Sequence, residues 1–436
     1  MKEERINKVL EKMKEIGLTQ MIITDPVSIA YLAVHYEDPI ERFWAFYLRT
    51  DGNHKLVANR LFTLNDVSDV EILWYSDGED GSALLNQYID HESPLGIDKC
   101  MAARFLLRLF DLNAAPKYVN ASDCVDDNRA CKDAEEQEKM KEASRINDAA
   151  MAEFKKLIHE GVTELEIADQ MEAIYKKLGA QGHSFEPLVG FGGNAANGHH
   201  GPDRTVLKKG DCVLFDVGCK KDGYCSDMTR TFFYGEVSPE HEKVYETVRR
   251  AQAAAEAMIR PGVKLCEIDH AARSVITEAG YGPYFTHRLG HFIGQEVHEK
   301  GDVSAANEAA AKPGMTFSIE PGIYLPGDVG VNVQGGGRRY MPQHGGKCFH
   351  IHAVFQCQRC ECMAQIMKSN MLAPCVFQDE LQSAAHYAGG DGAVLLHRGR
   401  EHPSGVHRLF VLPQHLNHRR RQDDLADGVL RLGRAD

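Results

Sequence analysis

The stretch VLFDVGCKKDGYCSDMTRT, residues 213–231, holds two strand-like runs separated by residues typical of a turn. The first run is apolar and covers Cys212–Val217, and the second covers Tyr224–Phe233. Between them, Lys220–Gly223 supplies an Asp-Gly pair, which favours a tight turn. The stretch therefore predicts a β-hairpin, around which the second half of the chain is organised.

Two aspartates lie on this predicted hairpin, and the strand register decides how they face each other. With the loop centred just before Asp222, Asp216 lies directly opposite Asp227. A turn at Asp222-Gly223 instead places Asp227 opposite Gly218. Like charges whose β-carbons are about 4.5–5.5 Å apart destabilise a sheet, and a cation between them removes the repulsion. The hairpin thus suggests a metal site, while two unrelated solvated acids fit the same pattern.

Three further clusters of polar residues occur in this half of the chain. A Gly/Asn-rich loop at 193–202 delivers two adjacent histidines, the first of which is His199. The segment 287–299 holds three histidines in a glycine-punctuated run, a density that favours metal ligation or proton transfer over core packing. In the segment 317–324, Glu320 ends a strand-like run just before a Pro-Gly turn.

One residue from each of the last two clusters completes a candidate metal-binding set with the hairpin aspartates. The set is Asp216, Asp227, His291 and Glu320. Three carboxylates and one imidazole suit Mn²⁺, Co²⁺ or Zn²⁺ better than they suit a thiolate-type site.

The order of these motifs resembles that of the pita-bread metallopeptidases, which include methionine aminopeptidase, aminopeptidase P, prolidase and creatinase. The shared pattern is two aspartates separated by ten residues, then Gly-His-x-Ile-Gly, then Ser-Ile-Glu-Pro-Gly. The likeness extends from Met1 to about Val333, because the N-terminal part is similar to the non-catalytic domain that precedes the catalytic domain in several of these enzymes. The motifs look most like those of bacterial Xaa-Pro dipeptidase, or prolidase, with aminopeptidase P as the close rival.

The resemblance implies a role for each matching residue. Asp216, Asp227, His291 and Glu320 correspond to ligands of two divalent metal ions, with Mn²⁺ expected and Co²⁺ or Zn²⁺ as alternatives. His199 and His298 correspond to histidines that contact the substrate, and Glu320 is expected to act also as a proton shuttle.

The implied reaction is hydrolysis of the Xaa-Pro bond in dipeptides. Water activated by the metals attacks the carbonyl carbon, His298 stabilises the oxyanion, and Glu320 protonates the proline nitrogen. Two other functions stay open, namely an aminopeptidase P acting on longer Xaa-Pro peptides and a non-catalytic pita-bread module that binds a peptide or a partner. Since relatives of this kind are commonly dimers, we expect a homodimer.

Gln334 departs from the family pattern. It ends the run Gly330-Val331-Asn332-Val333-Gln334, where the resemblance leads us to expect a glutamate shared by both metals. An amide offers a carbonyl oxygen but no anionic bridge, so we expect the second metal to bind weakly and the activity to be impaired.

The composition changes at the same point. From Val331 onward, eleven arginines accompany only Lys347 and Lys368, whereas lysine outnumbers arginine before it. We hypothesise that residues 334–436 form an aberrant tail produced by a reading-frame change near residue 332. The alternative is a genuine zinc-binding appendage built on the cysteines of 357–362.

Charge and hydropathy exclude several partners. The formal net charge of −13 argues against nucleic acid as the main partner, because phosphate binding needs a basic face. Met1–Leu18 is a charged amphipathic segment, and no later stretch reaches the roughly 18 uncharged apolar residues of a membrane span. We therefore expect a cytoplasmic protein without membrane or nucleic-acid partners, acting on short proline-containing peptides.

Periodicity and turn residues predict an α+β fold in three parts. Residues 1–130 alternate short strands and helices, the pattern of a mixed α/β domain, and the resemblance implies that this domain is creatinase-like. The resemblance implies that residues 131–333 form the pita-bread domain, truncated in sequence, and the order of elements predicts helices on one face of an antiparallel sheet. The tail 334–436 is expected to be of unknown or disordered structure. The longest predicted helices are Glu3–Ile16, Ala134–Ile158, Ser238–Ile259 and Leu265–Ala279, and Thr163 with Glu166 predicts a capping box.

Overall fold

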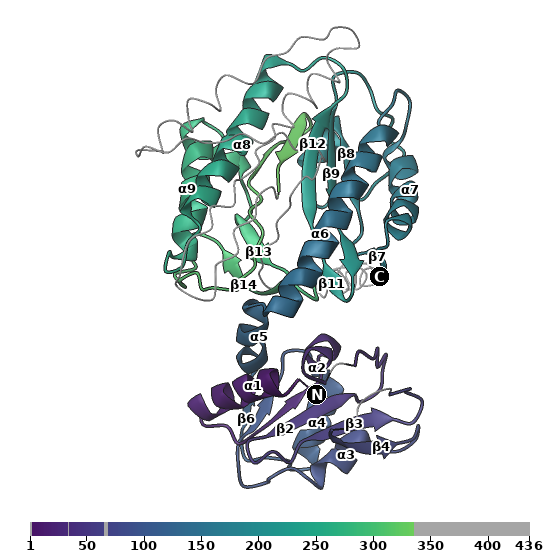
Figure 1. The fold of residues 1–436 in the computed structure, drawn as a ribbon, viewed down its shortest axis with the longest axis vertical. Helices are drawn as coiled ribbons and strands as arrows, with labels where there is room; N and C mark the ends of the chain where they lie inside the picture. The colour runs from purple at the N-terminus through teal and green to yellow at the C-terminus, as the bar shows by residue number, and fades with distance from the viewer. Residues whose placement is uncertain (1, 34, 65–68, 335–436) are drawn as a thin grey trace, which may run out of the picture.

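The computed structural model describes residues 2–33, 35–64 and 69–334 (Figure 1). The hypothesised aberrant tail lies outside the described residues apart from Gln334, and so does the cysteine cluster of the zinc alternative. Within the described part, a smaller N-terminal unit and a larger unit meet at helices α5 (Asp123–Ala130) and α6 (Ala134–Phe154).

The N-terminal unit is built on a mixed six-stranded sheet in the order β4-β3-β2-β1-β5-β6. Its strands are β1 (Gln20–Ile23), β2 (Ala45–Arg49), β3 (Lys55–Asn59), β4 (Glu71–Tyr75), β5 (Leu95–Ile97) and β6 (Tyr118–Asn120). Met21 and Ile23 of β1 enter one core, while Ile22 enters another. Both faces of the sheet are therefore covered, which explains why this central strand shows no alternation of polar and apolar residues.

Two pairs of helices supply that cover. Helices α1 (Glu3–Glu15) and α2 (Pro26–Ala33) pack on one face of the sheet, and α3 (Gly81–Asn86) and α4 (Ala103–Asp111) pack on the other. The predicted first helix is confirmed. It ends before Gly17, whose φ of 73° is the left-handed conformation that glycine adopts without strain.

The helices of the larger unit begin at capping residues that the sequence displays. The predicted capping box of Thr163 and Glu166 is confirmed at the start of α7 (Glu164–Lys177). The side chain of Ser238 caps α8 (Pro239–Met258), which has proline in its first turn. Helix α9 (Leu265–Glu278) packs against α8. No helix in the described part of the chain is long and apolar enough to cross a membrane.

The strands of the larger unit pair in antiparallel fashion. They form two three-stranded sheets, β12-β9-β8 and β11-β10-β7, and two strand pairs, β13-β14 and β15-β16. Their bounds are β7 (Gly182–His183), β8 (Leu188–Phe191), β9 (Cys212–Val217), β10 (Cys219–Lys221), β11 (Tyr224–Cys225), β12 (Met228–Phe233), β13 (Gly290–Phe292), β14 (Glu299–Val303), β15 (Gly322–Leu325) and β16 (Val329–Asn332).

The expectation that helices cover one face of this sheet is wrong for the central strand β9. Val213 and Phe215 enter a core shared with α6 and α7, whereas Cys212 and Leu214 enter a core shared with α8 and α9. In Figure 1, these two pairs of helices lie on opposite sides of β8, β9 and β12. An unbroken apolar run, as in Cys212–Phe215, is the sequence signal of a strand buried on both faces.

The hairpin of residues 212–233 is confirmed, but the register that opposes Asp216 and Asp227 is wrong. Asp216 pairs with Thr229, as the turn at Asp222-Gly223 requires. Asp222 and Gly223 have φ values of 49° and 79°, which a two-residue hairpin turn of the twist-matching type needs at both positions. Because side chains alternate along a strand, the two aspartates still project from one face, as diagonal neighbours.

Candidate metal centre

Three of the predicted metal ligands come together, each in a strand or next to one. Asp227 lies in the break between β11 and β12, His291 lies in β13, and Glu320 precedes β15. The His291 Nε2 atom is 3.1 Å from Asp227 Oδ2 and 3.1 Å from Glu320 Oε1. A single imidazole therefore bridges two carboxylates from distant parts of the chain.

Asp216 contributes a third carboxylate from the end of β9. Its Oδ1 atom is shielded from solvent and has no hydrogen-bond partner among the described residues. Burial, together with the negative charges of Asp227 and Glu320, raises the pKa of Asp216 well above its usual range. A buried carboxylate crowded by two others needs a positive partner, and the unpaired oxygen is where such a partner can bind.

The imidazole of His291 partly meets this need in the metal-free protein. Burial opposes its charged form, but the Glu320 and Asp227 carboxylates outweigh burial and raise the pKa of His291 to about 10. For Glu320, burial favours the neutral form, but His291 outweighs it and lowers the pKa of Glu320 to about 2. Burial and crowding therefore disfavour the charged form of Asp216, while the ionised Glu320 is paired with the His291 imidazolium.

Ser318 holds His291 and Glu320 in place, and the sequence reasoning did not single it out. Its hydroxyl donates to Glu320 Oε1 at 2.7 Å and accepts from the backbone N–H of His291 at 2.8 Å. A Cβ atom on Gly290 would lie 1.9 Å from the Ser318 carbonyl oxygen, so only glycine permits this approach. The small residues beside each ligand in the Gly-His and Ser-Ile-Glu motifs are the signal that could have identified this contact.

The two predicted substrate histidines differ in their surroundings. His298 lies against His291, with ring centroids 4.3 Å apart and planes at 86°. Burial and the charge of His291 lower the pKa of His298 to about 3. His199 is exposed on the loop that follows the 3₁₀ turn Gly192–Ala196, although its charge still contributes to lowering the pKa of His298.

Gln334 occupies the space beside Asp227. Its side chain is 1% exposed, its Nε2 atom donates to Asp227 Oδ2 at 2.8 Å, and its Oε1 atom accepts from the Thr229 hydroxyl at 3.0 Å. Its backbone N–H donates to the carbonyl of Thr229, which places residue 334 alongside β12. The amide therefore turns its donor, and not its carbonyl oxygen, toward the carboxylates.

The donor set fits a divalent cation. Three carboxylates and an imidazole converge, and one buried carboxylate oxygen lacks a partner, which is the arrangement that hard or borderline cations accept. Within the described chain, the group whose three possible ligand atoms all lie within 4.8 Å of one another is a different one, Glu164, His200 and Asp203. There the Glu164 carboxylate already accepts hydrogen bonds from four donors, so we interpret that group as an anchor of its loop.

The comparisons with known proteins define the class. Residues 5–131 match the Creatinase/Prolidase N-terminal domain, and residues 138–339 match Metallopeptidase family M24. The chain is 35% identical over 338 residues to "Putative dipeptidase YkvY" of Bacillus subtilis (strain 168), an alignment that covers 76% of this chain and 93% of the relative. The chain therefore belongs to metallopeptidase family M24.

Solved structures share this architecture. The recombinant prolidase from Thermococcus sibiricus has a TM-score of 0.73 and 34% identity, and the match covers 77% of this chain and 93% of that chain. The X-Pro aminopeptidase from Thermotoga maritima MSB8 has a TM-score of 0.66 and 28% identity, with 74% and 94% covered. The expected family and its two-domain α+β architecture are thus confirmed.

Proposed function

We propose that this protein hydrolyses the Xaa-Pro bond of dipeptides with the help of divalent metal held by Asp216, Asp227, His291 and Glu320. The observation that carries the proposal is the solvent-shielded Asp216 Oδ1, which has no partner within the described chain while two more carboxylates crowd it. The name of the Thermococcus sibiricus relative, a prolidase, supports the choice of substrate.

The protein's own residues divide the remaining work. Bound metal would polarise the scissile carbonyl and activate water. His298, whose ring lies against His291, would donate a hydrogen bond to the oxygen on which charge develops. Glu320 would carry a proton to the proline nitrogen, while the Ser318 hydroxyl orients its Oε1 atom. This proton is required because an amide nitrogen leaves poorly without it.

We further propose that Gln334 weakens the binding of a second ion and so impairs the activity. Its amide N–H group occupies Asp227 Oδ2, an oxygen that a second cation would need. Its carbonyl oxygen is engaged by Thr229 and adds no negative charge. With glutamate at position 334, a carboxylate oxygen, which accepts hydrogen bonds, would replace the amide N–H that now donates to Asp227.

Two alternative functions stay open. The name of the Thermotoga maritima relative favours an aminopeptidase that releases the first residue from longer Xaa-Pro peptides. The hydrogen-bonded Gln334 favours a non-catalytic module that binds a peptide without cleaving it.

The test is hydrolysis of Gly-Pro and of Gly-Pro-Ala by metal-stripped protein, before and after addition of Mn²⁺, with Asp227→Asn as the inactive control. We expect Mn²⁺-dependent cleavage of the dipeptide and little cleavage of the tripeptide. Preferred cleavage of the tripeptide would establish the aminopeptidase alternative. Binding of Gly-Pro by calorimetry without any cleavage would establish the binding module and refute the proposed reaction.

Four finer features complete the proposal. We propose Mn²⁺ as the metal, a cytoplasmic location, a homodimer, and a domain boundary near residue 130. The domain matches, which end at 131 and resume at 138, support that boundary.

The seven cysteines of the described part are free thiols, which suits a reducing compartment. Sedimentation equilibrium would measure the oligomeric state, and a monomer at micromolar concentration would remove the homodimer.

A further inference from the structure

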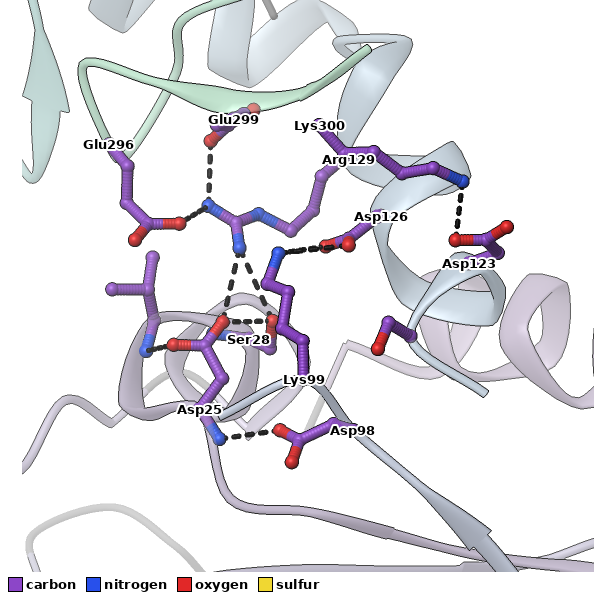
Figure 2. Close-up of polar contacts among 12 residues, drawn as sticks. Asp25, Ser28, Asp98, Lys99, Asp123, Asp126, Arg129, Glu296, Glu299 and Lys300 are labelled. Carbon is purple, nitrogen blue, oxygen red and sulfur yellow. Dashed lines mark hydrogen bonds and ion pairs between the residues drawn. The ribbon is translucent and has the colours of Figure 1, made fainter. Parts of the chain in front are cut away.

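Arg129 is a deeply buried charge at the contact between the two units. It lies near the end of α5, its side chain is 2% exposed, and its guanidinium contacts residues from both units (Figure 2). Toward the N-terminal unit, Nη1 donates to Asp25 Oδ2 at 3.3 Å and to Ser28 Oγ at 3.2 Å. Toward the larger unit, Nη2 donates to Glu296 Oε2 and to Glu299 Oε1, each at 2.7 Å.

The two glutamates belong to residues 293–299, which comprise the connection after β13 and the first residue of β14, and which we call the His298 loop. Its backbone folds around the Glu299 carboxylate. The N–H of Gln295 donates to Glu299 Oε1 at 2.9 Å, and a Cβ atom on Gly294 would lie 2.5 Å from that same oxygen. Lys132 donates to the other carboxylate oxygen at 2.9 Å. The backbone of the His298 loop therefore folds around the Glu299 carboxylate, and Arg129 donates a hydrogen bond to that carboxylate.

His298 stands immediately before Glu299. Because His298 lies in a bend and is bonded directly to Glu299, the first residue of β14, the contact that fixes Glu299 also restricts the direction of His298. That direction leads to the metal centre, where the His298 ring meets His291. Burial favours the neutral form of Glu299, but Arg129 and Lys132 lower its pKa to about 2, so the contact stays ionised over the working range of pH.

We propose that Arg129 is a positioning residue for the peptidase reaction, coupling the N-terminal unit to the His298 loop. The proposal rests on the proposed function for its catalytic part. Asp25 supplies the anchor on the other side, because its carboxylate also accepts from the N–H of Ser28 at the start of α2 and its own N–H donates to Asp98. Figure 2 shows the guanidinium between this anchor and the two glutamates.

A second set of ion pairs joins the same helix and strand without touching the His298 loop. Lys300 of β14 pairs with Asp123 and with Asp127 of α5. Its side chain is one-third exposed and points away from Arg129 in Figure 2. Loss of these pairs loosens the contact between α5 and β14 but leaves Glu296 and Glu299 engaged. Lys300→Met is therefore a matched control for Arg129→Met.

The test compares wild type, Arg129→Met, Arg129→Lys and Lys300→Met in two assays. The first is amide hydrogen exchange of residues 293–299, with α8 as an internal reference. The second is kcat/KM for Gly-Pro with Mn²⁺. We expect Arg129→Met to speed exchange of the His298 loop at least about tenfold and to lower kcat/KM about 10–100-fold, the range typical of residues that orient a ligand shell. Arg129→Lys should recover only part of both effects, because its single ammonium group cannot reach acceptors in both units, as the Arg129 guanidinium does.

Two results would overturn the proposal. One is a folded Arg129→Met protein whose His298 loop exchanges as in wild type. The other is an equal effect of Lys300→Met, which would reduce Arg129 to general docking of α5. If Arg129→Met does not fold, Glu296→Gln replaces it with the same expected direction, because the Glu296 side chain is 24% exposed and its substitution disturbs less packing. Failure of wild type to cleave Gly-Pro counts against the proposed function alone, since the exchange assay reads the loop directly.

Discussion

Replacing Glu164 by glutamine tests how the loop that carries His199 is anchored. Glu164 is the first residue of α7 and is fully buried. Each carboxylate oxygen accepts from two donors of the 191–203 segment. The donors are the Phe191 N–H at 2.7 Å, Asn194 Nδ2 at 3.0 Å, His200 Nε2 at 2.6 Å and the Asp203 N–H at 3.1 Å.

The magnitude follows from the donors that glutamine can satisfy. Its carbonyl oxygen serves Phe191 and Asn194, but its NH₂ group then faces His200 and Asp203. His200 can change tautomer and accept, so one charge-assisted hydrogen bond becomes a neutral one. The Asp203 N–H is left without an acceptor, and because Asp203 is an exposed residue, water relieves part of the about 1–3 kcal/mol that a fully buried donor would cost. The weakened histidine contact adds about 1 kcal/mol. We therefore expect Glu164→Gln to lower the free energy of unfolding by about 1–3 kcal/mol.

Urea unfolding followed by far-UV circular dichroism measures this loss. Tryptophan fluorescence is unsuitable, because both tryptophans, Trp44 and Trp74, lie in the N-terminal unit. Glu166→Gln is the matched control, since it lies on the same helix with an exposed side chain and keeps an acceptor for the capping box. Equal stability of Glu164→Gln and Glu166→Gln would refute the reasoning.

The remaining predictions concern the metal centre and pH. Gln334→Glu should raise the number of tightly bound Mn²⁺ ions, measured by calorimetry, from one to two; an unchanged count would contradict the role given to the amide. Asp216→Asn should raise the Tm of the metal-free protein, by about 2–4 °C per kcal/mol of relieved repulsion, and abolish the further rise caused by Mn²⁺. Burial, only partly offset by Arg5, raises the pKa of Glu136 from 4.5 to about 7, so the folded state keeps a proton that the unfolded state releases. Stability should therefore fall by up to about 3 kcal/mol as pH rises from 4.5 to 7. The free energy of unfolding of Glu136→Gln, measured with urea, should depend less steeply on pH than that of wild type. The same pH dependence in both proteins would contradict this prediction.

Local signals allowed most of the elements to be predicted. The Asp222-Gly223 pair marks a turn, and Thr163 with Glu166 marks a helix start, because both act through contacts between neighbours in sequence. The hairpin register was the exception, because the sequence left two registers open and the one that opposes Asp216 and Asp227 is wrong. Turn chemistry alone, given more weight than the symmetry of the two aspartates, would have selected the register that pairs Asp216 with Thr229.

The candidate ligands could be predicted because their types and spacing form motifs, and the structure brings Asp227, His291 and Glu320 into contact. Their roles as metal ligands stay predictions. The residues that support them were missed, since Arg129 meets Glu299 across 170 positions of the chain and no local pattern encodes that meeting. A buried arginine looks no different in sequence from an arginine on the surface.

The central claim is that four side chains from distant segments bind divalent metal together. Crystals soaked in Mn²⁺ and measured at the manganese absorption edge test it most directly. The account predicts an anomalous peak in contact with Asp216, Asp227, His291 and Glu320. No peak there, or a peak confined to Glu164, His200 and Asp203, would contradict it.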